Sequence, residues 1–215
     1  MIIKVKNDFR NLKAGDKFDF SVISDIKAIC VVGENGCGKS SIFQALRGLK
    51  NDSKTSSLYE SDFEKLAVNI EVEHKYEKIF YYDNVKDDGQ NFMVGFDAVN
   101  FVTSGGLENS RRSHGEGSLG YLAKFIHETT PKIVAGKTLI VFDEVDNGFS
   151  IKNMSKFVNV INNLMHQNVE VIVISHNPFL MNDMRMVYDF EKKDLELSSR
   201  YIKEQTGFIL NDKKK

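Results

Sequence analysis

Apolar and polar positions alternate differently in the two halves of the chain. In the first half, Ile2–Val5 and residues 18–22 are predicted to be strands, the second because apolar and polar residues alternate in KFDFSVI. Ala28–Val32 is a short continuous apolar run, which is typical of a strand buried on both faces. Residues 66–94 contain three more strand-like pieces, LAVNIEVEH, KIFYYDNV and NFMVGF. The short polar turns between them predict an antiparallel arrangement.

The second half alternates helices with buried strands. GSLGYLAKFIHE and SKFVNVINNLMHQ place apolar residues at helical spacing, whereas KTLIVFDE and VEVIVISH contain near-continuous apolar runs. This alternation predicts a mostly parallel sheet covered by helices, and MVYDF and LELSSRYI are predicted to complete the fold. The sequence therefore predicts one α/β domain over 1–215. Its antiparallel β part spans about 1–25 and 66–100, and its core about 26–50 and 113–190.

A glycine-rich segment follows the first buried strand. The stretch VVGENGCGKSSI fits the pattern G-x-x-x-x-G-K-[ST], and a helical pattern follows it with Ile42, Phe43, Leu46 and Leu49 on one face. In such a P-loop, successive backbone N–H groups and the helix N-terminus hold phosphate oxygens. The lysine reaches the β- and γ-phosphates, and the serine hydroxyl binds Mg²⁺. The predicted nucleotide contacts are Gly33, Glu34, Asn35, Gly36, Cys37, Gly38, Lys39, Ser40 and Ser41.

Three further polar residues end two buried strands. Asp143 and Glu144 close TLIVFDE, and His176 closes VEVIVISH. Ligands of open parallel sheets bind at the carboxyl ends of the strands, so these side chains are expected beside the P-loop. We expect Asp143, with Ser40, to hold Mg²⁺ and Glu144 to polarise the attacking water. His176 is expected to touch the γ-phosphate, and with Glu144 and Lys39 it forms the predicted catalytic set.

A second anion site is predicted near the middle of the chain. In RRSHGEGSLGYL, residues 113–117 open a helix, whose N-terminal amides and Ser113 hydroxyl suit a phosphate. One chain has no evident use for two phosphate cradles, whereas a pair of chains does. Residues 113–117, which include Ser113, Gly115 and Glu116, therefore form the predicted second anion site.

Composition limits the function classes. The net charge of −1 gives no argument for strong nucleic-acid binding by the whole chain. The longest apolar runs, such as VIVI and LIVF, are too short to span a bilayer, and the N-terminus lacks a secretory apolar region, so no membrane segment is expected. The two cysteines, Cys30 and Cys37, lie beside the glycine-rich segment and fit a reducing cytoplasm.

Together these segments resemble the ATP-binding-cassette ATPases, and within them the soluble branch of chromosome-maintenance and RecF/RecN-type proteins. FRNL, the P-loop, DEVDNGFS and ISHNPFL carry the resemblance over nearly the whole chain. Residues 112–116, RSHGE, stand where the family has L-S-G-G-Q, and they look most like the signature of small stand-alone ATPases with SHGE. The resemblance implies ATP and Mg²⁺ as ligands and a head-to-tail homodimer that forms on ATP binding. In that dimer Ser113 and Gly115 would reach the γ-phosphate on the partner's P-loop.

The chain departs from the family pattern at several positions. His114 replaces the first signature glycine, and Ser150 stands where the loop after DE usually ends in aspartate. The family's Mg²⁺-binding glutamine has no clear counterpart; Gln90 lies in a polar turn and Asn100 is a weak substitute. Two residues, Phe9 and Arg10, are candidates by position for stacking on adenine, although Phe9 fits the core equally well.

Three functional hypotheses follow. The first is a Mg²⁺-dependent ATPase that works as a nucleotide-gated homodimer, alone or with an effector protein or a DNA-bound partner. The second is the nucleotide-binding subunit of a membrane transporter, against which the short, strand-rich region before residue 112 and the altered signature argue. The third is a module that senses ATP with negligible turnover, for which the unusual signature and Ser150 argue.

Overall fold

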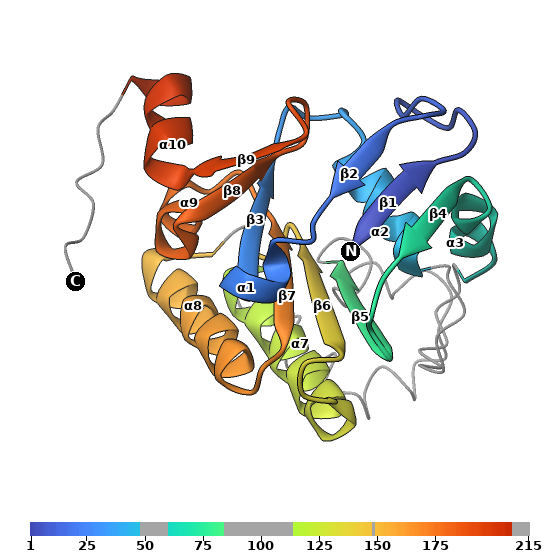
Figure 1. Ribbon diagram of the computed structural model, residues 1–215. Coiled ribbons are helices and arrows are strands. Elements are labelled where there is room, and N and C mark those ends of the chain that lie inside the picture. Colours follow the sequence, from blue (N-terminus) through green and yellow to red (C-terminus); the bar gives the residue numbers. More distant parts are fainter. Residues whose placement is uncertain (48–59, 84–113, 148, 208–215) are drawn as a thin grey trace.

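A six-stranded sheet forms the centre of the molecule (Figure 1). The computed structural model describes residues 1–47, 60–83, 114–147 and 149–207. The strands lie in the order β5 (Lys78–Asp83), β6 (Thr138–Asp143), β7 (Glu170–Ile174), β3 (Ala28–Val32), β8 (Met186–Asp189) and β9 (Asp194–Leu197). Neighbouring strands from β5 to β8 are parallel, and β9 is antiparallel to β8. The predicted α/β fold with a mostly parallel core sheet is therefore confirmed, and we call this the large sheet.

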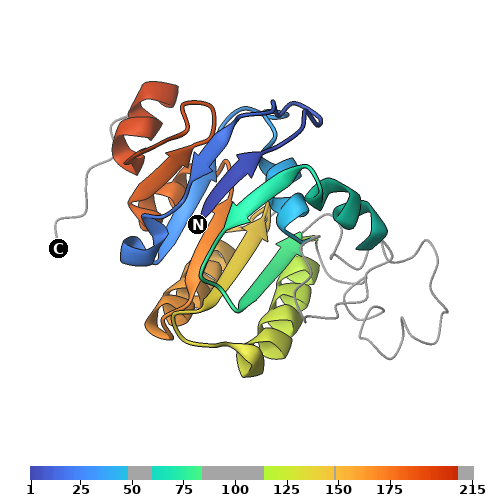
Figure 2. The same cartoon turned by 45° about the vertical axis from the view of Figure 1, so that its right-hand side comes forward.

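A small antiparallel sheet packs beside it, as the turned view in Figure 2 shows. Strand β1 (Ile2–Val5) lies in its middle, between β2 (Lys17–Asp19) and β4 (Ile70–Glu73). Buried residues of β1 and β2 alternate with less buried ones, and Ile3 and Phe18, which face each other in the register, are both fully buried. The alternation therefore places one face of this sheet on the core.

Helices cover both faces of the large sheet. The elements besides the strands are α1 (Ile23–Ile26), α2 (Lys39–Arg47), α3 (Glu60–Ala67), α7 (His114–Thr129), the 3₁₀ turn η2 (Thr130–Lys132), α8 (Ile151–His166), α9 (Pro178–Met184) and α10 (Ser198–Thr206). On one face, α2 and the small sheet share a core with Val31, Val141 and Ile174. On the other face, α7 and α8 pack on Phe142 and Val173 (Figure 1).

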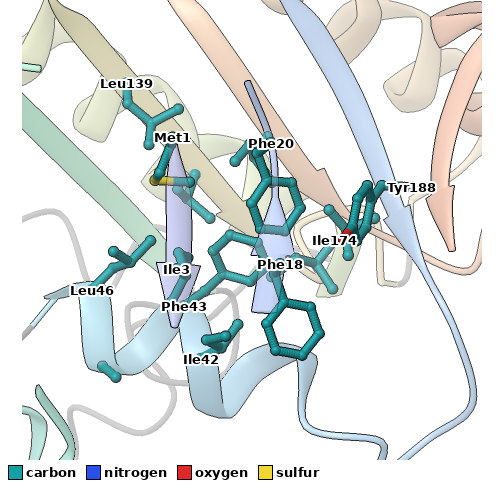
Figure 3. Packing of buried hydrophobic residues seen from close by; sticks show 14 of the residues in the cluster. Met1, Ile3, Phe18, Phe20, Ile42, Phe43, Leu46, Leu139, Ile174 and Tyr188 are labelled. Atoms are coloured by element: carbon teal, nitrogen blue, oxygen red, sulfur yellow. The ribbon is translucent and has the colours of Figure 1, made fainter. Parts of the chain in front are cut away.

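The core that holds α2 in place is drawn in Figure 3. Its labelled side chains come from α2, from the large sheet, and from β1, β2 and the residues next to these two strands, and they include Ile3, Phe18 and Phe43. Ile42, Phe43 and Leu46 of α2 are buried, as their helical spacing predicts. Leu49, the fourth residue of that predicted face, lies outside the described residues. Burial of this face fixes the direction in which α2 leaves the P-loop.

Two strand predictions were wrong in part. The chain leaves β2 at Asp19 and forms α1 from Ile23, because the Asp19 carboxylate accepts the backbone N–H of Ser21 and turns the chain. Strand β5 was expected in the antiparallel part, but it joins the large sheet parallel to β6. Residues of β5 alternate between the two cores of the large sheet, which a parallel strand buried on both faces requires.

The other predicted strands and helices of the second half are present. Residues 66–74 contribute β4 but begin with the end of α3, and residues 91–96 lie outside the described residues. Within the described ranges, no helix is long and apolar enough to cross a bilayer.

Candidate nucleotide site

The P-loop, residues 33–40, joins β3 to α2 in the predicted strand–loop–helix context. Gly33, Gly36 and Gly38 have φ values of 142°, 84° and 108°, a region that residues with a Cβ rarely adopt. At Gly38 a Cβ would also lie 2.8 Å from Cδ2 of Leu12. The glycines therefore serve two purposes, since they give the loop its curvature and let it pass close to the segment after β1.

Lys39 is buried inside the curve of the loop, with a relative exposure of 6%. Its Nζ donates to the carbonyl oxygens of Gly33 at 2.7 Å and Glu34 at 2.8 Å, and to the sulfur of Cys37 at 3.6 Å. The ammonium thus lies within the loop's own backbone, where a phosphate could replace these weaker acceptors.

Ser40 brings the P-loop to the end of β6. Its hydroxyl donates to Asp143 Oδ1 at 3.3 Å, and the hydroxyl of Tyr81 on β5 donates to Asp143 Oδ2 at 2.5 Å. Burial raises the pKa of Asp143 to about 6; the two hydrogen bonds oppose this rise, and the charge on Asp83 adds to it. A cation at this point would stabilise the charged form of Asp143.

Glu144 follows Asp143 with a left-handed backbone, φ 50°, and its N–H donates to the carbonyl of Ile174 at 3.0 Å. This conformation is uncommon for a residue with a side chain and is held by the neighbouring strand β7. Glu144 reaches a cavity of about 300 Å³ at the mouth of the P-loop. The cavity is lined by Arg10, Asn11, Asn35, Gly36, Gly38, Lys39, Ser40, Ser41 and Glu144.

His176 follows β7 and Ser175, on the same edge of the sheet. We call this the carboxyl edge, where the parallel strands end at Asp83, Asp143, Ile174 and Val32. Partial burial and the charge on Lys39 lower the pKa of His176, whereas Glu144 and Asp146 raise it. The charges of Lys39 and Glu144 therefore both act on this ring, and the catalytic role of His176 stays a prediction.

Polar residues around this edge are fixed by hydrogen bonds. Ser175 donates to Asp146 Oδ2 at 2.7 Å, which ties the segment after β6 to the end of β7. Ser150 begins α8 as its N-cap and accepts the backbone N–H of Asn153 at 3.3 Å. The serine that replaces the family's aspartate thus has a structural role at the start of a helix.

The sequence predicted only some of the contacts that the segment after β1 makes near the P-loop. Arg10 donates to Ser41 Oγ at 2.9 Å and to Gln44 Oε1 at 3.2 Å, while Phe9 packs against the core. Asn11 donates to the carbonyl of Gly36. Of the two residues considered for adenine stacking, Arg10 lies at the nucleotide cavity and Phe9 does not. Asn11 was missed, because its contact depends on a fold between segments 25 residues apart.

The P-loop also contacts the part of the large sheet that lies on the other side of β3 from β6 and β7. The carboxylate of Glu191, in the turn between β8 and β9, accepts the backbone N–H of Glu34 at 2.6 Å. Glu191 has no motif around it, so nothing in the sequence indicated this contact.

The predicted second anion site is described only in part. Ser113 lies outside the described residues, as do Gln90 and Asn100. Gly115 and Glu116 lie in the first turn of α7, so a helix does begin where the sequence predicted. Because α7 leads through η2 to the start of β6, its first turn points back toward the carboxyl edge. The role of the three residues stays a prediction.

The donors at the P-loop suit Mg²⁺. A serine hydroxyl and a buried carboxylate are hard oxygen ligands, and Mg²⁺ is usually held by one or two carboxylates together with substrate phosphates and water. Within the described ranges, no three His, Cys, Asp or Glu side chains gather into a metal cluster. The residues therefore fit a metal that arrives with a phosphate ligand.

Comparisons with known proteins find similarities of sequence and of fold. The lantibiotic transport ATP-binding protein SrtF of Streptococcus pyogenes is 23% identical over 172 residues, which cover 76% of this chain and 73% of SrtF. UvrABC system protein A of Malacoplasma penetrans is 32% identical over 96 residues, 45% of this chain and 9% of the relative. A metal-chelate-type ABC transporter in an inward-facing conformation shares the fold, with a TM-score of 0.51 at 14% identity, over 97% of this chain and 88% of that one.

The family itself is shown by a longer match. The sequence profile of the AAA domain family matches residues 5–215, which include the P-loop, Asp143, Glu144 and His176. This confirms the resemblance at the level of the ATPase superfamily, while the finer branch and the SHGE signature stay predictions. On the strength of a P-loop fold and a match that spans nearly its whole length, the chain belongs to the AAA domain family.

Proposed function

We propose that the protein binds Mg²⁺-ATP and hydrolyses it as a nucleotide-gated head-to-tail homodimer. The observation that carries the proposal is the hydrogen bond from Ser40 to Asp143, which joins the P-loop to the end of β6. Glu144 follows Asp143 directly and lines the cavity at this junction. Phosphate-binding, metal-binding and water-orienting groups therefore lie at one point of the carboxyl edge.

Each residue has a defined part in this proposal. Lys39 exchanges its carbonyl contacts for β- and γ-phosphate oxygens, and Ser40 and Asp143 hold the Mg²⁺ that neutralises the triphosphate. Glu144 orients and polarises the attacking water. His176, whose pKa is lowered, is neutral at pH 7 and can donate one ring N–H to the γ-phosphate or the water.

The carboxyl edge also supports association with a second copy. Ile151 at the start of α8 and Phe179 at the start of α9 are 77% and 66% exposed, and both helices begin just after strands that end at this edge. The first turn of α7 points the same way. A second copy that covers this edge would bury two large apolar side chains while its α7 approaches the P-loop.

Steady-state phosphate release and size measurement test the proposal together. Glu144→Gln is expected to lower phosphate release by about 100-fold or more, because the general base is lost, and to accumulate a dimer in Mg²⁺-ATP. Glu128→Gln, at an exposed position near the end of α7, is the charge-matched control and is expected to behave as wild type. Equal phosphate release by wild type and Glu144→Gln would contradict hydrolysis and favour a module that senses ATP.

A membrane-transport role is the second candidate. The likeness to SrtF, which is named as a transport ATP-binding protein, favours it. In that case the protein would bind a membrane subunit, and ATP alone would not be sufficient for its full turnover. The result that would favour this role is a Glu144→Gln protein that binds nucleotide but stays monomeric in saturating Mg²⁺-ATP. An effector protein or a DNA-bound partner remains part of the first proposal.

A further inference from the structure

The turn after β8 is held in place beside the P-loop. The backbone N–H of Phe190 donates to the carbonyl of Val32 at 2.9 Å, which extends the pairing of β8 with β3 to the last residue before the loop. The Phe190 ring is buried and stacks on Phe18, with the ring centroids 4.3 Å apart. Asp189 Oδ1 accepts the backbone N–H of Glu191 at 3.0 Å, so a side chain closes the turn. These contacts present Glu191 to the P-loop from a fixed position.

One peptide unit of the P-loop is held from two sides. Gly33 contributes its carbonyl, which accepts Lys39 Nζ at 2.7 Å. Glu34 contributes its N–H, which donates to the carboxylate of Glu191 at 2.6 Å. In a trans peptide the carbonyl and the N–H point in opposite directions. The peptide therefore lies between an ammonium at its carbonyl end and a carboxylate at its N–H end.

The two charges favour the same orientation of this peptide. Its dipole points the carbonyl at the cation and the N–H at the anion, and charge-assisted hydrogen bonds at both ends strengthen one another. The reverse orientation would turn the carbonyl toward the carboxylate and the N–H toward the ammonium. Gly33, with a φ of 142°, gives the backbone little preference of its own. A contact from outside the loop is therefore needed to select one orientation.

The bond from Glu34 lies away from the place where a phosphate would bind. The cavity at the mouth of the P-loop is lined by Lys39 and by Asn35, whereas Glu34 and Glu191 are not among its lining residues. The carboxylate thus does not occupy a position that a phosphate oxygen would take. Its effect on a nucleotide would pass through the peptide to Lys39.

We propose that Glu191 is a positioning residue for the nucleotide site. By accepting the N–H of Glu34 it keeps the Gly33 carbonyl turned inward, and this carbonyl holds Lys39 inside the loop before the phosphates arrive. A site that is already ordered binds more tightly, because less conformational entropy is lost on binding. The inference rests on the proposed function, since it concerns the same P-loop and the same ATP.

Two variants of equal charge test the role of the acceptor. Both Glu191→Ala and Glu191→Gln remove a negative charge near the phosphates, but glutamine keeps an oxygen that can accept the N–H of Glu34. Calorimetry with a non-hydrolysable ATP analogue and Mg²⁺ measures their affinities. Glu191→Ala is expected to bind about fivefold or more weakly than Glu191→Gln, which should stay within about threefold of wild type. Equal affinities of the two variants would overturn the proposal, and so would tighter binding by Glu191→Ala.

Glu196→Ala is the matched control. Glu196 lies on β9, and its carboxylate accepts Lys192 Nζ at 3.1 Å. The variant removes an acid and an ion pair next to the same turn but leaves the bond between Glu34 and Glu191 in place. Because exposed ion pairs contribute little, its affinity for the analogue is expected to stay within about threefold of wild type. A loss as large as that of Glu191→Ala would assign the effect to the turn as a whole and overturn the role of Glu191.

The amide proton of Glu34 gives a second readout that needs no nucleotide. Nuclear magnetic resonance of the full-length protein should show it downfield in wild type. The resonance is expected to move upfield by about 0.5 ppm or more in Glu191→Ala, and by less in Glu191→Gln, because a neutral acceptor makes a weaker bond. An unchanged resonance in Glu191→Ala would overturn the inference while the proposed function stands. A wild type that binds no ATP analogue would overturn the proposed function, and this inference with it.

Discussion

At Gly38 two distant segments of the chain come into close contact. A Cβ there would lie 2.8 Å from Leu12, and the residue also has a φ of 108°. We expect Gly38→Ala to carry both penalties, so that the free energy of unfolding falls by about 1 kcal/mol for backbone strain and about 1–3 kcal/mol more for overpacking. Displacing the loop should also weaken nucleotide binding about tenfold or more, since backbone donors to phosphate would be misplaced.

Gly15 provides a matched control for that substitution. Its φ is 92°, but no atom lies within 4 Å of the position that an alanine methyl group would take, so Gly15→Ala carries the backbone penalty without the clash. Urea denaturation and titration with a fluorescent ATP analogue measure the two effects. Equal losses of stability in the two variants would show that the Leu12 side chain moves away from the added methyl group without lowering the free energy of unfolding.

The two cysteines differ in their surroundings. Cys30 is fully buried in β3, where burial raises the pKa of its thiol, whereas Cys37 is half-buried in the P-loop. We expect iodoacetamide to modify Cys37 in the native protein and Cys30 only after unfolding, because thiolate and access are both needed. Mg²⁺-ATP should slow the reaction at Cys37. Mass spectrometry of digests measures both sites, and native labelling of Cys30 would contradict the buried position of β3.

Among the elements, α8 shows how a helix start is fixed beside the candidate site. Ser150 accepts the N–H of Asn153, and the apolar face of the helix packs Phe157, Ile161 and Leu164 on the large sheet. A cap satisfies a backbone donor that would otherwise have no partner within the helix. The position of the segment after Glu144 therefore depends on this cap as well as on the bond between Ser175 and Asp146.

Removing the cap should destabilise the protein by a small, measurable amount. Ser150→Ala is expected to lower the free energy of unfolding by about 1 kcal/mol. Ser155→Ala is the control on the same helix, because the Ser155 hydroxyl bonds to the carbonyl of Ile151 inside the helix and alanine has the higher helix propensity. Its stability is expected to be unchanged or slightly higher. Chemical denaturation measures both variants, and equal losses would exclude a capping role for Ser150.

At the scale of the whole molecule, four large apolar side chains are exposed in the described part of the chain, and one of them, Val68, lies between α3 and β4. Ile151 and Phe179 begin helices at the carboxyl edge, whereas Leu197, 56% exposed, ends β9 opposite the start of β8 and so lies at the other edge of the sheet. If a second copy covers the carboxyl edge on ATP binding, a charge at either of the first two positions should oppose it.

Charge substitutions test this asymmetry. In a Glu144→Gln background, Ile151→Glu and Phe179→Glu are each expected to weaken the Mg²⁺-ATP-dependent dimer about tenfold or more, because a charge would lose water in an apolar contact. Leu197→Glu makes the same chemical change at the other edge and should leave the dimer intact. Light scattering coupled to size exclusion gives the dimer fraction. Dissociation by Leu197→Glu alone would place the interface at the wrong edge for the proposed dimer.

Much of the fold and part of the site could be predicted from local pattern. Ala28–Val32 and the apolar run before Asp143 are long enough and apolar enough to specify buried strands, and the glycine spacing of 33–40 specifies the loop. Strand β5 could not be placed in this way. Its sequence is equally compatible with an antiparallel meander, and its contacts with β6 join residues 60 positions apart.

What the sequence by itself determined is therefore the chemistry of single segments: a phosphate-binding loop, a pair of acids and a histidine, each at the end of a buried strand. Periodicity and glycine placement act over a few residues, so they can be read without knowing the fold. The tertiary structure decided which of these ends are neighbours. Strand order placed Asp83 beside Asp143, and the segment after β1 brought Asn11 to Gly36. Such contacts depend on pairing and packing between distant segments, whose free energy no local pattern records.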